Sequence, residues 1–191
     1  MTTADSQTPA SELRASHSGV GRGTSRKAER VSDDLRFGTG SWLEQRRSVS
    51  RASLVAMAAL AVVNAYQAGL IRRPPEPRLP LLDAARVDGA GEAYEMFKTP
   101  DAALGLVSYA LTLVLAGMGD RRRSETAPWI PLALLGKVVL DAGSGLFLTA
   151  EQATKHRRFC SWCLVAAAAS VAMVPRAWPE GVAAWRHLRQ R

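Results

Sequence analysis

Cys160 and Cys163 are the two cysteines of this chain, and they lie in the run Phe-Cys-Ser-Trp-Cys at the start of an apolar segment. Their spacing places both thiols on one turn of a helix. A cysteine at the start of a helix is close to the positive end of the helix dipole, and the basic run at 155–158 adds positive charge just before it. Both effects favour the reactive thiolate. We therefore predict a dithiol/disulfide switch in which Cys160 is the outer, more nucleophilic and more accessible thiol, and Cys163 lies one turn deeper.

The pair can serve several kinds of chemistry. As a relay, the outer thiol would exchange disulfides with a soluble protein, and the inner thiol would pass electrons to an acceptor dissolved in the bilayer. The two residues could instead be small apolar side chains of a packed helix. They could also be half of a zinc site, but structural zinc takes four ligands and His156 is the one further candidate nearby. We therefore predict no metal site.

The elements that must position the pair are apolar segments. Residues 52–71 carry no formal charge, and similar runs cover 102–119, 128–150 and 159–174. About 20 apolar residues cross a hydrocarbon core of roughly 30 Å as a helix. The sequence therefore predicts an all-α fold, an integral membrane four-helix bundle over residues 50–175.

The two ends of the chain are polar. Residues 1–48 are dominated by Ser, Thr, Gly and charged residues, which predicts a disordered cytoplasmic tail. Pro175 and Pro179 are expected to end the last span, because proline removes a helix hydrogen bond. Residues 176–191 would then form a short basic C-terminal tail, with a surface helix from 180 onwards.

The distribution of Lys and Arg predicts the orientation in the cell membrane. Three arginines at 121–123 lie in the short loop after the second span, and more basic residues precede the first span. By the positive-inside rule both ends of the chain are cytoplasmic, and the cysteines face the extracytoplasmic side. The net charge of +8 fits contact with anionic membrane lipid. Nucleic acid is not expected as a partner, because the basic residues flank spans and form no single patch.

Two further features of the sequence leave alternatives open. The segment 72–100 between the first two spans is either a lid over the space between the helices or a linker with interfacial aromatic residues. Thr99, Pro100 and Asp101 predict a helix start, with the hydroxyl as cap and proline in the first turn. Lys137 and Asp141, four residues apart in the third span, either neutralise each other or relay protons.

The arrangement resembles the vitamin K epoxide reductase family. The resemblance rests on the runs Ala-Ala-Leu-Gly-Leu-Val-Ser-Tyr at 102–109, Asp-Ala-Gly-Ser-Gly at 141–145 and Phe-Cys-Ser-Trp-Cys at 159–163. It implies a membrane thiol:quinone oxidoreductase, with ubiquinone or menaquinone as cofactor. It further implies that Cys160 exchanges with a thiol partner, and that Cys163 contacts the quinone ring and can form an adduct with it. By the same resemblance, Asp101 or its neighbour Thr99 would hydrogen-bond a quinone carbonyl. Candidate walls of the quinone pocket are aromatic, and each could instead anchor the membrane interface: Tyr94, Phe97, Phe159 and Trp162.

The sequence departs from the family in one respect. The family commonly has a second cysteine pair in the loop after the first helix, whereas residues 72–100 contain no cysteine. Either Cys160 exchanges directly with a thioredoxin-like or disulfide-oxidase protein, or another chain supplies the loop pair, or the role has changed. The expected purpose is disulfide formation in extracytoplasmic proteins. Two alternatives remain: electron flow in the reverse direction, and a non-enzymatic membrane subunit or assembly factor resembling the small four-helix proteins of amine dehydrogenase maturation.

Overall fold

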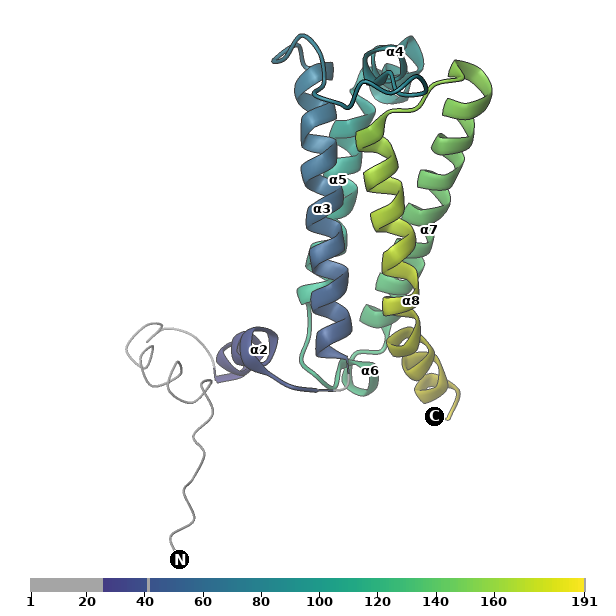
Figure 1. Cartoon of the computed structure of the whole chain (residues 1–191). Coiled ribbons are helices and arrows are strands. Elements are labelled where there is room, and N and C mark those ends of the chain that lie inside the picture. Colours follow the sequence, from purple (N-terminus) through teal and green to yellow (C-terminus); the bar gives the residue numbers. More distant parts are fainter. Residues whose placement is uncertain (1–25, 41, 191) are drawn as a thin grey trace, which may run out of the picture.

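The computed structural model describes residues 26–40 and 42–190, and this part of the chain is helical without a β-strand. The long helices α3, α5, α7 and α8 run side by side, with α4 over one end and α6 at the other (Figure 1). The predicted all-α class is confirmed. In chain order the helices are α2 (Arg26–Phe37), α3 (Leu43–Gln67), α4 (Ala84–Asp88), η1 (Gly91–Tyr94), η2 (Met96–Lys98), α5 (Asp101–Gly117), α6 (Arg123–Thr126), α7 (Trp129–Glu151), η3 (Gln152–His156) and α8 (Ser161–Arg189).

Three helical segments of the described chain are long and apolar enough to cross a membrane: Leu43–Gln67, Trp129–His156 and Ser161–Arg189. The helix α5 is also apolar, but it has 17 residues and is shorter than these three. Three of the four predicted spans therefore correspond to helices long enough to cross a membrane. In the bundle, α5 packs against both α3 and α7.

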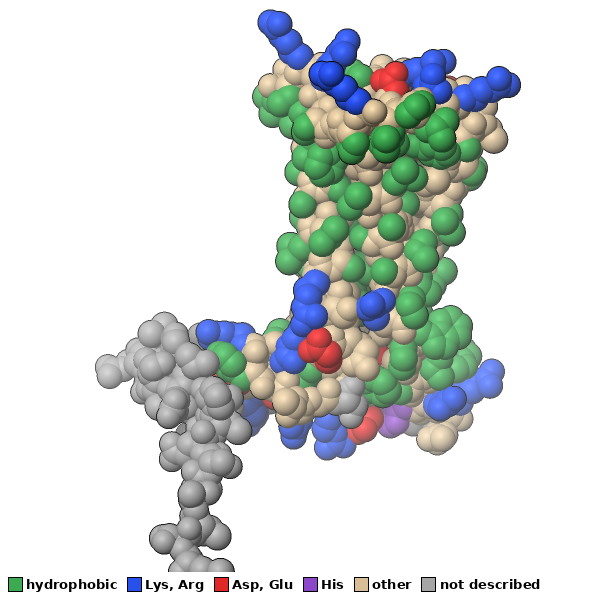
Figure 2. Space-filling view, in the orientation of Figure 1, with side chains coloured by type: hydrophobic (Ala, Val, Ile, Leu, Met, Phe, Trp, Pro, Cys, Tyr) green, Lys and Arg blue, Asp and Glu red, His purple; other side chains and the backbone are tan. Residues whose placement is uncertain are grey.

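The flanks of the bundle are apolar, and charged side chains gather towards its two ends (Figure 2). Large apolar side chains point outwards from each long helix, among them Val55, Val107, Leu140 and Val171. A helix that is apolar on all sides is expected in lipid. The half-exposed Trp129 and Trp178, near the end that holds α6, suit the aromatic belt of a membrane interface.

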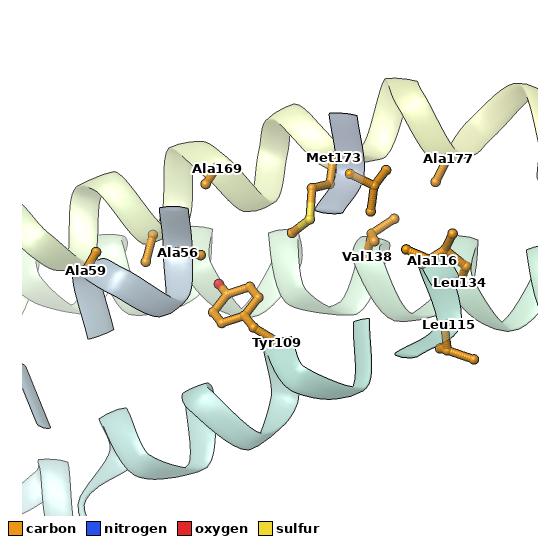
Figure 3. Close-up of a cluster of buried hydrophobic side chains, with 12 residues drawn as sticks. Ala56, Ala59, Tyr109, Leu115, Ala116, Leu134, Val138, Ala169, Met173 and Ala177 are labelled. Atoms are coloured by element: carbon orange, nitrogen blue, oxygen red, sulfur yellow. The ribbon is translucent and has the colours of Figure 1, made fainter. Parts of the chain in front are cut away.

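Small residues allow the helices to approach closely in the core. Ala56 and Ala59 of α3 and Ala169 of α8 are buried in one cluster, together with larger side chains of α5 and α7 (Figure 3). Small residues at helix contacts are typical of membrane bundles. The hydroxyls of Tyr109 and Ser170 form a buried hydrogen bond of 2.6 Å within this core, which joins α5 to α8.

The prediction of a disordered tail over residues 1–48 is wrong for the described residues 26–40 and 42–48; residues 1–25 and 41 lie outside the described part of the chain. Here α2 forms, and α3 begins at Leu43 instead of 52. Arg47 of α3 donates hydrogen bonds to the carbonyls of Leu35 (3.0 Å), Asp34 (3.2 Å) and Gly38 (2.7 Å). The last carbonyls of a helix need such external partners. A residue outside the segment therefore stabilises α2.

The predicted end of the last helix at 174 is also wrong, because α8 continues through Pro175 and Pro179 to Arg189. The reason is a buried ion cluster beyond the prolines. Glu180 of α8 is 2% exposed and pairs with Arg46 of α3 (2.6 Å) and with Arg123 of α6 (2.8 Å). A buried charge is stable only beside a charge of opposite sign, so these ion pairs hold the end of α8 against the bundle.

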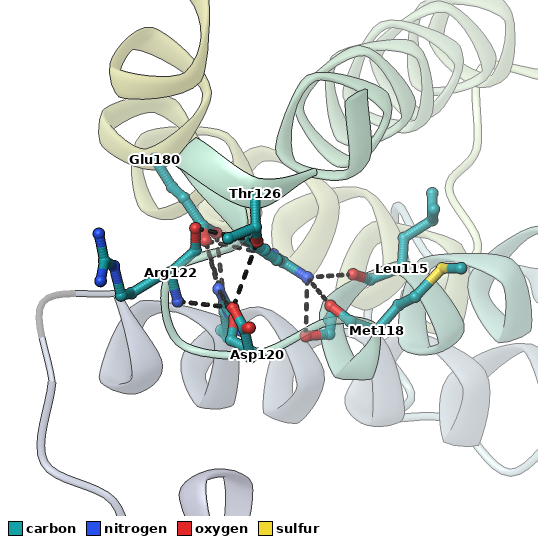
Figure 4. A network of polar contacts seen from close by, with 9 residues as sticks. Leu115, Met118, Asp120, Arg122, Thr126 and Glu180 are labelled. Carbon is teal, nitrogen blue, oxygen red and sulfur yellow. Dashed lines mark hydrogen bonds and ion pairs between the residues drawn. The ribbon is translucent and has the colours of Figure 1, made fainter. Parts of the chain in front are cut away.

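The same cluster closes the end of α5. Arg123 donates to the carbonyls of Leu115 (2.6 Å) and Met118 (2.7 Å), and Arg46 donates to that of Asp120 (3.0 Å). Figure 4 shows the side chain of Glu180 reaching towards this turn of the chain. The helices α3, α6 and α8 and the end of α5 are thereby joined at the end of the bundle that lies farthest from α4.

Candidate functional site

The cysteines lie at the start of α8, as the sequence predicts. Cys160 is the N-cap residue of α8, and its sulfur accepts a hydrogen bond of 3.2 Å from the backbone N–H of Cys163. The backbone N–H of Cys160 donates to Oε1 of Gln152 (2.9 Å). The helix N-terminus is thus directed at the Cys160 sulfur.

The predicted order of accessibility is wrong. Cys160 is fully buried, whereas Cys163 is partly exposed and lines a cavity. Sequence position along the span suggested the opposite order, because the first residue of a helix is closer to the membrane surface. The physical reason for the reversal is that the segment 72–100 folds back over the head of α8.

Hydrogen bonds join that segment to α8. The backbone N–H of Phe159 donates to the carbonyl of Leu81 (2.9 Å), and the carbonyl of Phe159 accepts from the N–H of Asp83 (3.0 Å). The indole N–H of Trp162 donates to the carbonyl of Pro75 (2.8 Å). The segment therefore covers Cys160, as expected for a lid.

Asp88, the last residue of α4, lies beside the two sulfurs. The Cys163 thiol donates to Oδ1 of Asp88 at 3.3 Å. The ligand-type atoms of Asp88, Cys160 and Cys163 all lie within 4.8 Å of one another. Asp88 is 4% exposed, and its second oxygen, Oδ2, is buried without a hydrogen-bond partner. Burial, together with the negative charges of Asp101 and Glu76, raises the pKa of Asp88 to about 6, although the two neighbouring thiols oppose the rise.

Gln67, the last residue of α3, connects Asp88 with Asp101. Its side-chain amide donates to the backbone carbonyl of Asp88 (3.2 Å) and to Oδ1 of Asp101 (2.7 Å). Its side-chain oxygen accepts from the N–H of Ala102 (3.3 Å). One amide thus fixes α4 and the start of α5 relative to each other.

A cavity of about 680 Å³ adjoins these groups, and its lining is mainly apolar. It lies between α3, α5, α7 and α8, and the segment 87–96 lies over it. Ligand pockets in proteins commonly have this size and character. The polar groups near Cys163 in its wall include Asp88, Asp101 and Gln152.

A second polar cluster reaches the cavity from the side. Lys137 contacts both carboxylate oxygens of Asp141 (2.5 and 2.6 Å) and the hydroxyl of Ser108 (2.7 Å). Thr112 donates a further hydrogen bond to Asp141 (3.1 Å). Ser108 and Asp141 line the cavity. Both oxygens of Asp141 are paired, and this geometry lets Lys137 and Asp141 neutralise each other's charge.

Of the six residues predicted to bind the quinone, Asp101 alone lines the cavity. Phe97 is 85% exposed, and Tyr94 uses its hydroxyl to donate to the carbonyl of Gln67 (3.0 Å). Phe159 and Trp162 bind the covering segment, as described above. Thr99 does not cap α5, because its hydroxyl donates to the carbonyl of Phe97 (3.2 Å) and Pro100 is the N-cap residue. The structure therefore does not bring these five side chains into the cavity wall.

Three residues of the site were not predicted from the sequence: Asp88, Gln67 and Gln152. Gln67 lies within the predicted first span, and a polar side chain in a span is a signal of an internal partner. Gln152 follows the third span directly. Asp88 gave no such signal, because Asp-Gly in a loop is typical of a turn.

The chemistry of the donor set is that of a dithiol beside a carboxylate. Structural zinc takes four protein ligands, and the cluster of Asp88 with the two cysteines provides three donors. One thiol reaches an apolar cavity and the other is held at a helix N-terminus. Such a pair can lose two electrons by forming a disulfide, and the neighbouring carboxylate can take up protons.

A comparison with protein-family models finds one that matches residues 48–178, which is more than half of the 191 residues. This model is described as the vitamin K epoxide reductase family. No curated protein matches the sequence. The matched range contains both cysteines, Asp88, Asp101 and the greater part of the four long helices.

Proposed function

Because the chain belongs to the vitamin K epoxide reductase family, we propose that it is a membrane thiol:quinone oxidoreductase whose redox centre is Cys160 with Cys163. The family resemblance predicted from the motifs is thereby confirmed. Members of this family are in general membrane oxidoreductases of thiols and quinones. The roles of individual residues, the quinone and the partner protein belong to the proposal.

One observation carries the proposal: the thiol of Cys163 lies in the wall of an apolar cavity of about 680 Å³, while that of Cys160 lies behind it at the N-cap of α8. A lipid-soluble quinone suits such a cavity. Cys163 is therefore the thiol that faces the quinone, and Cys160 is the thiol that exchanges with a partner protein.

The reaction transfers two electrons and two protons from the dithiol to the quinone. A quinone bound in the cavity accepts both electrons and both protons and leaves as quinol, while the two thiols become a disulfide. Asp101 lines the cavity and Gln67 fixes its position, so its carboxyl group can donate a hydrogen bond to a quinone oxygen when it is protonated. A dithiol protein of the thioredoxin type then reduces the disulfide through a mixed disulfide at Cys160.

The covering segment determines how the partner gains access. Residues 72–100 contain no cysteine, so this chain has no loop pair to carry electrons to Cys160. The partner exchanges directly, and the contacts of Phe159 and Trp162 with the segment must open to admit it. Disulfide formation in extracytoplasmic proteins is the proposed purpose, with the thiol end outside and the arginines at 121–123 in the cytoplasm.

The proposal also treats α5 as a fourth crossing. Its 17 residues span about 26 Å at 1.5 Å per residue. That is close to a hydrocarbon core of roughly 30 Å. The short helix η2 precedes α5 in the chain, and the short helix α6 follows it.

The test uses the full chain purified in detergent. Both thiols are trapped and weighed by mass spectrometry, first after addition of a reduced thioredoxin-type dithiol protein and again after addition of a short-chain quinone. We expect the disulfide to be reduced in the first step and re-formed in the second, with quinol appearing in equal amount. Cys160→Ala and Cys163→Ala should each abolish turnover.

Ser161→Ala provides a matched control, because Ser161 lies between the cysteines and has one long hydrogen bond, to Glu76 (3.4 Å). This variant should turn over like the wild type. Thiols that stay unchanged through both additions, in protein that is folded, would refute the proposal and favour a structural pair.

A further inference from the structure

The position of Asp88 is unusual for a structural residue. It is almost fully buried, yet one of its carboxylate oxygens has no partner, and the other accepts from the Cys163 thiol at 3.3 Å. Buried polar groups are nearly always hydrogen-bonded, because leaving one unsatisfied costs free energy. A carboxylate kept in this state next to reactive groups is a candidate for function.

The location of Asp88 relative to the cavity indicates that function. Asp88 lines the same cavity as Cys163 and Asp101, so it can contact both the thiol and a ligand held there. The Cys160 sulfur also lies within 4.8 Å of a carboxylate oxygen of Asp88. Its backbone carbonyl is held by Gln67 (3.2 Å), and the carboxylate is therefore fixed beside the sulfurs.

We propose that Asp88 is a catalytic residue that takes the proton of the Cys163 thiol as the pair is oxidised and passes it to the quinone. This inference rests on the proposed function and assigns the route of the protons in it. The S–H bond of Cys163 breaks, and its proton goes to Asp88 Oδ1. The disulfide bond forms, and two electrons reduce the quinone to the quinol. The proton of the Cys160 thiol follows through the same carboxylate, so that two protons accompany two electrons.

The surroundings of Asp88 set the pH dependence. The groups that face it are both thiols of α8, Asp101 at the start of α5 and Glu76 in the covering segment. The cavity wall also contains Glu92, Glu95, Glu151 and His156. With a pKa of about 6, Asp88 is a carboxylate above pH 6 and accepts a proton there, whereas below pH 6 it is already protonated. Oxidation of the dithiol by quinone should therefore slow as the pH falls through about 6.

The first test compares the wild type with Asp88→Asn. General base catalysis contributes about 10²- to 10⁴-fold, so the variant should oxidise its thiols at least 100-fold more slowly at pH 7.5 and lose the inflection near pH 6. Its thermal stability at pH 8 should equal or exceed that of the wild type, because the folded state no longer holds a buried carboxylate with a raised pKa. A merely structural Asp88 would give the opposite result, a less stable protein.

Asp83→Asn is the matched control. Asp83 caps the N-terminus of α4 by accepting from the N–H of Arg86 (3.1 Å), and asparagine caps as well as aspartate. It removes one carboxylate from the same segment without touching a sulfur. This variant should keep both the rate and the pH inflection.

A second measurement needs no quinone. In reduced protein carrying Cys160→Ser, the infrared S–H stretch reports the Cys163 thiol, and its band should shift when Asp88→Asn is added. An unchanged band would overturn the inference, as would an unchanged oxidation rate in Asp88→Asn or a wild-type rate that is flat between pH 5 and 7. If Asp88→Asn fails to fold, two other results test the inference. The wild-type oxidation rate must fall as the pH falls through about 6, and Asp88→Glu must keep part of the wild-type rate. A wild type that does not react with quinone at all, but whose S–H band responds to Asp88, would refute the proposed function and leave the thiol–carboxylate contact established.

Discussion

Replacement of Glu180 by glutamine tests the ion cluster at the end of the bundle away from the thiols. The carboxylate of Glu180 accepts from Arg46 (2.6 and 3.1 Å) and from Arg123 (2.8 and 2.9 Å). Glu180→Gln preserves the size of the side chain and removes the negative charge. Two buried guanidinium groups would then share one neutral amide oxygen and the backbone carbonyls, and the amide NH2 would face a donor.

The expected loss of stability follows from burial. Arg46 and Glu180 are 2% exposed, and Arg123 is 0% exposed, so water screens these charges little. Removing one partner of a buried ion pair costs about 3–5 kcal/mol. At 1.4 kcal/mol for each tenfold change, that corresponds to roughly 10²- to 4 × 10³-fold in the folding equilibrium.

The assay is unfolding in mixed micelles with increasing SDS, followed by circular dichroism. Glu180→Gln should unfold at a clearly lower SDS fraction than the wild type. Glu125→Gln is the matched control, because the Arg122–Glu125 pair has the same separation of 2.6 Å but is exposed. Its midpoint should equal that of the wild type. A Glu180→Gln midpoint as high as that of Glu125→Gln would refute the role assigned to the cluster, and adding Arg46→Met to Glu180→Gln should recover part of the loss.

Three further predictions concern the thiol end and the cavity. Trp162→Phe removes the hydrogen bond to the carbonyl of Pro75, worth about 1 kcal/mol, so alkylation of Cys160 by a water-soluble maleimide should become about fivefold faster; an unchanged rate would mean that this bond does not hold the cover. Asp141→Asn should lower folded yield and turnover by the same factor, because both oxygens of Asp141 are occupied by Lys137 and its neighbours; a much larger loss of turnover, measured per folded molecule, would instead indicate a proton relay. Ser144→Phe places bulk in the cavity wall from an exposed position, so KM for a short-chain quinone should rise several-fold while disulfide exchange with the partner protein stays unchanged; equal effects on both half-reactions would argue against the cavity as the quinone site.

The helices around the site could be predicted from the sequence because lipid demands long apolar segments, and such segments are visible in composition. The start of α8 at the cysteine pair followed from the position of the apolar run. Asp101 was named because the family that the motifs resemble has a polar side chain near the start of its second helix. The end of α8 could not be found in this way. Pro175 and Pro179 are local signals that a helix ends, whereas the partners of Glu180 are 134 and 57 residues away in sequence.

The burial of Cys160 and the role of Asp88 were missed for a related reason. Both depend on how residues 72–100 fold over the bundle, and that segment has no apolar period to indicate a preferred surface. Its position is determined by single hydrogen bonds, such as that between Asp83 and Phe159, which local sequence does not reveal. The helix α2 is similar, because Arg47 supplies the partners for its terminal carbonyls.

The ion cluster of Arg46, Arg123 and Glu180 gives the bundle two ends of unequal stiffness. At one end, charge fixes α3 and α8 to each other and to the chain between α5 and α7. At the other, hydrogen bonds of the backbone and of the Trp162 indole hold the segment 72–100 over Cys160. If the proposed function holds, a partner protein would reach Cys160 by displacing residues 72–100, without separating any pair of long helices. The cross-section of the protein within the membrane would then change very little during the proposed catalytic cycle.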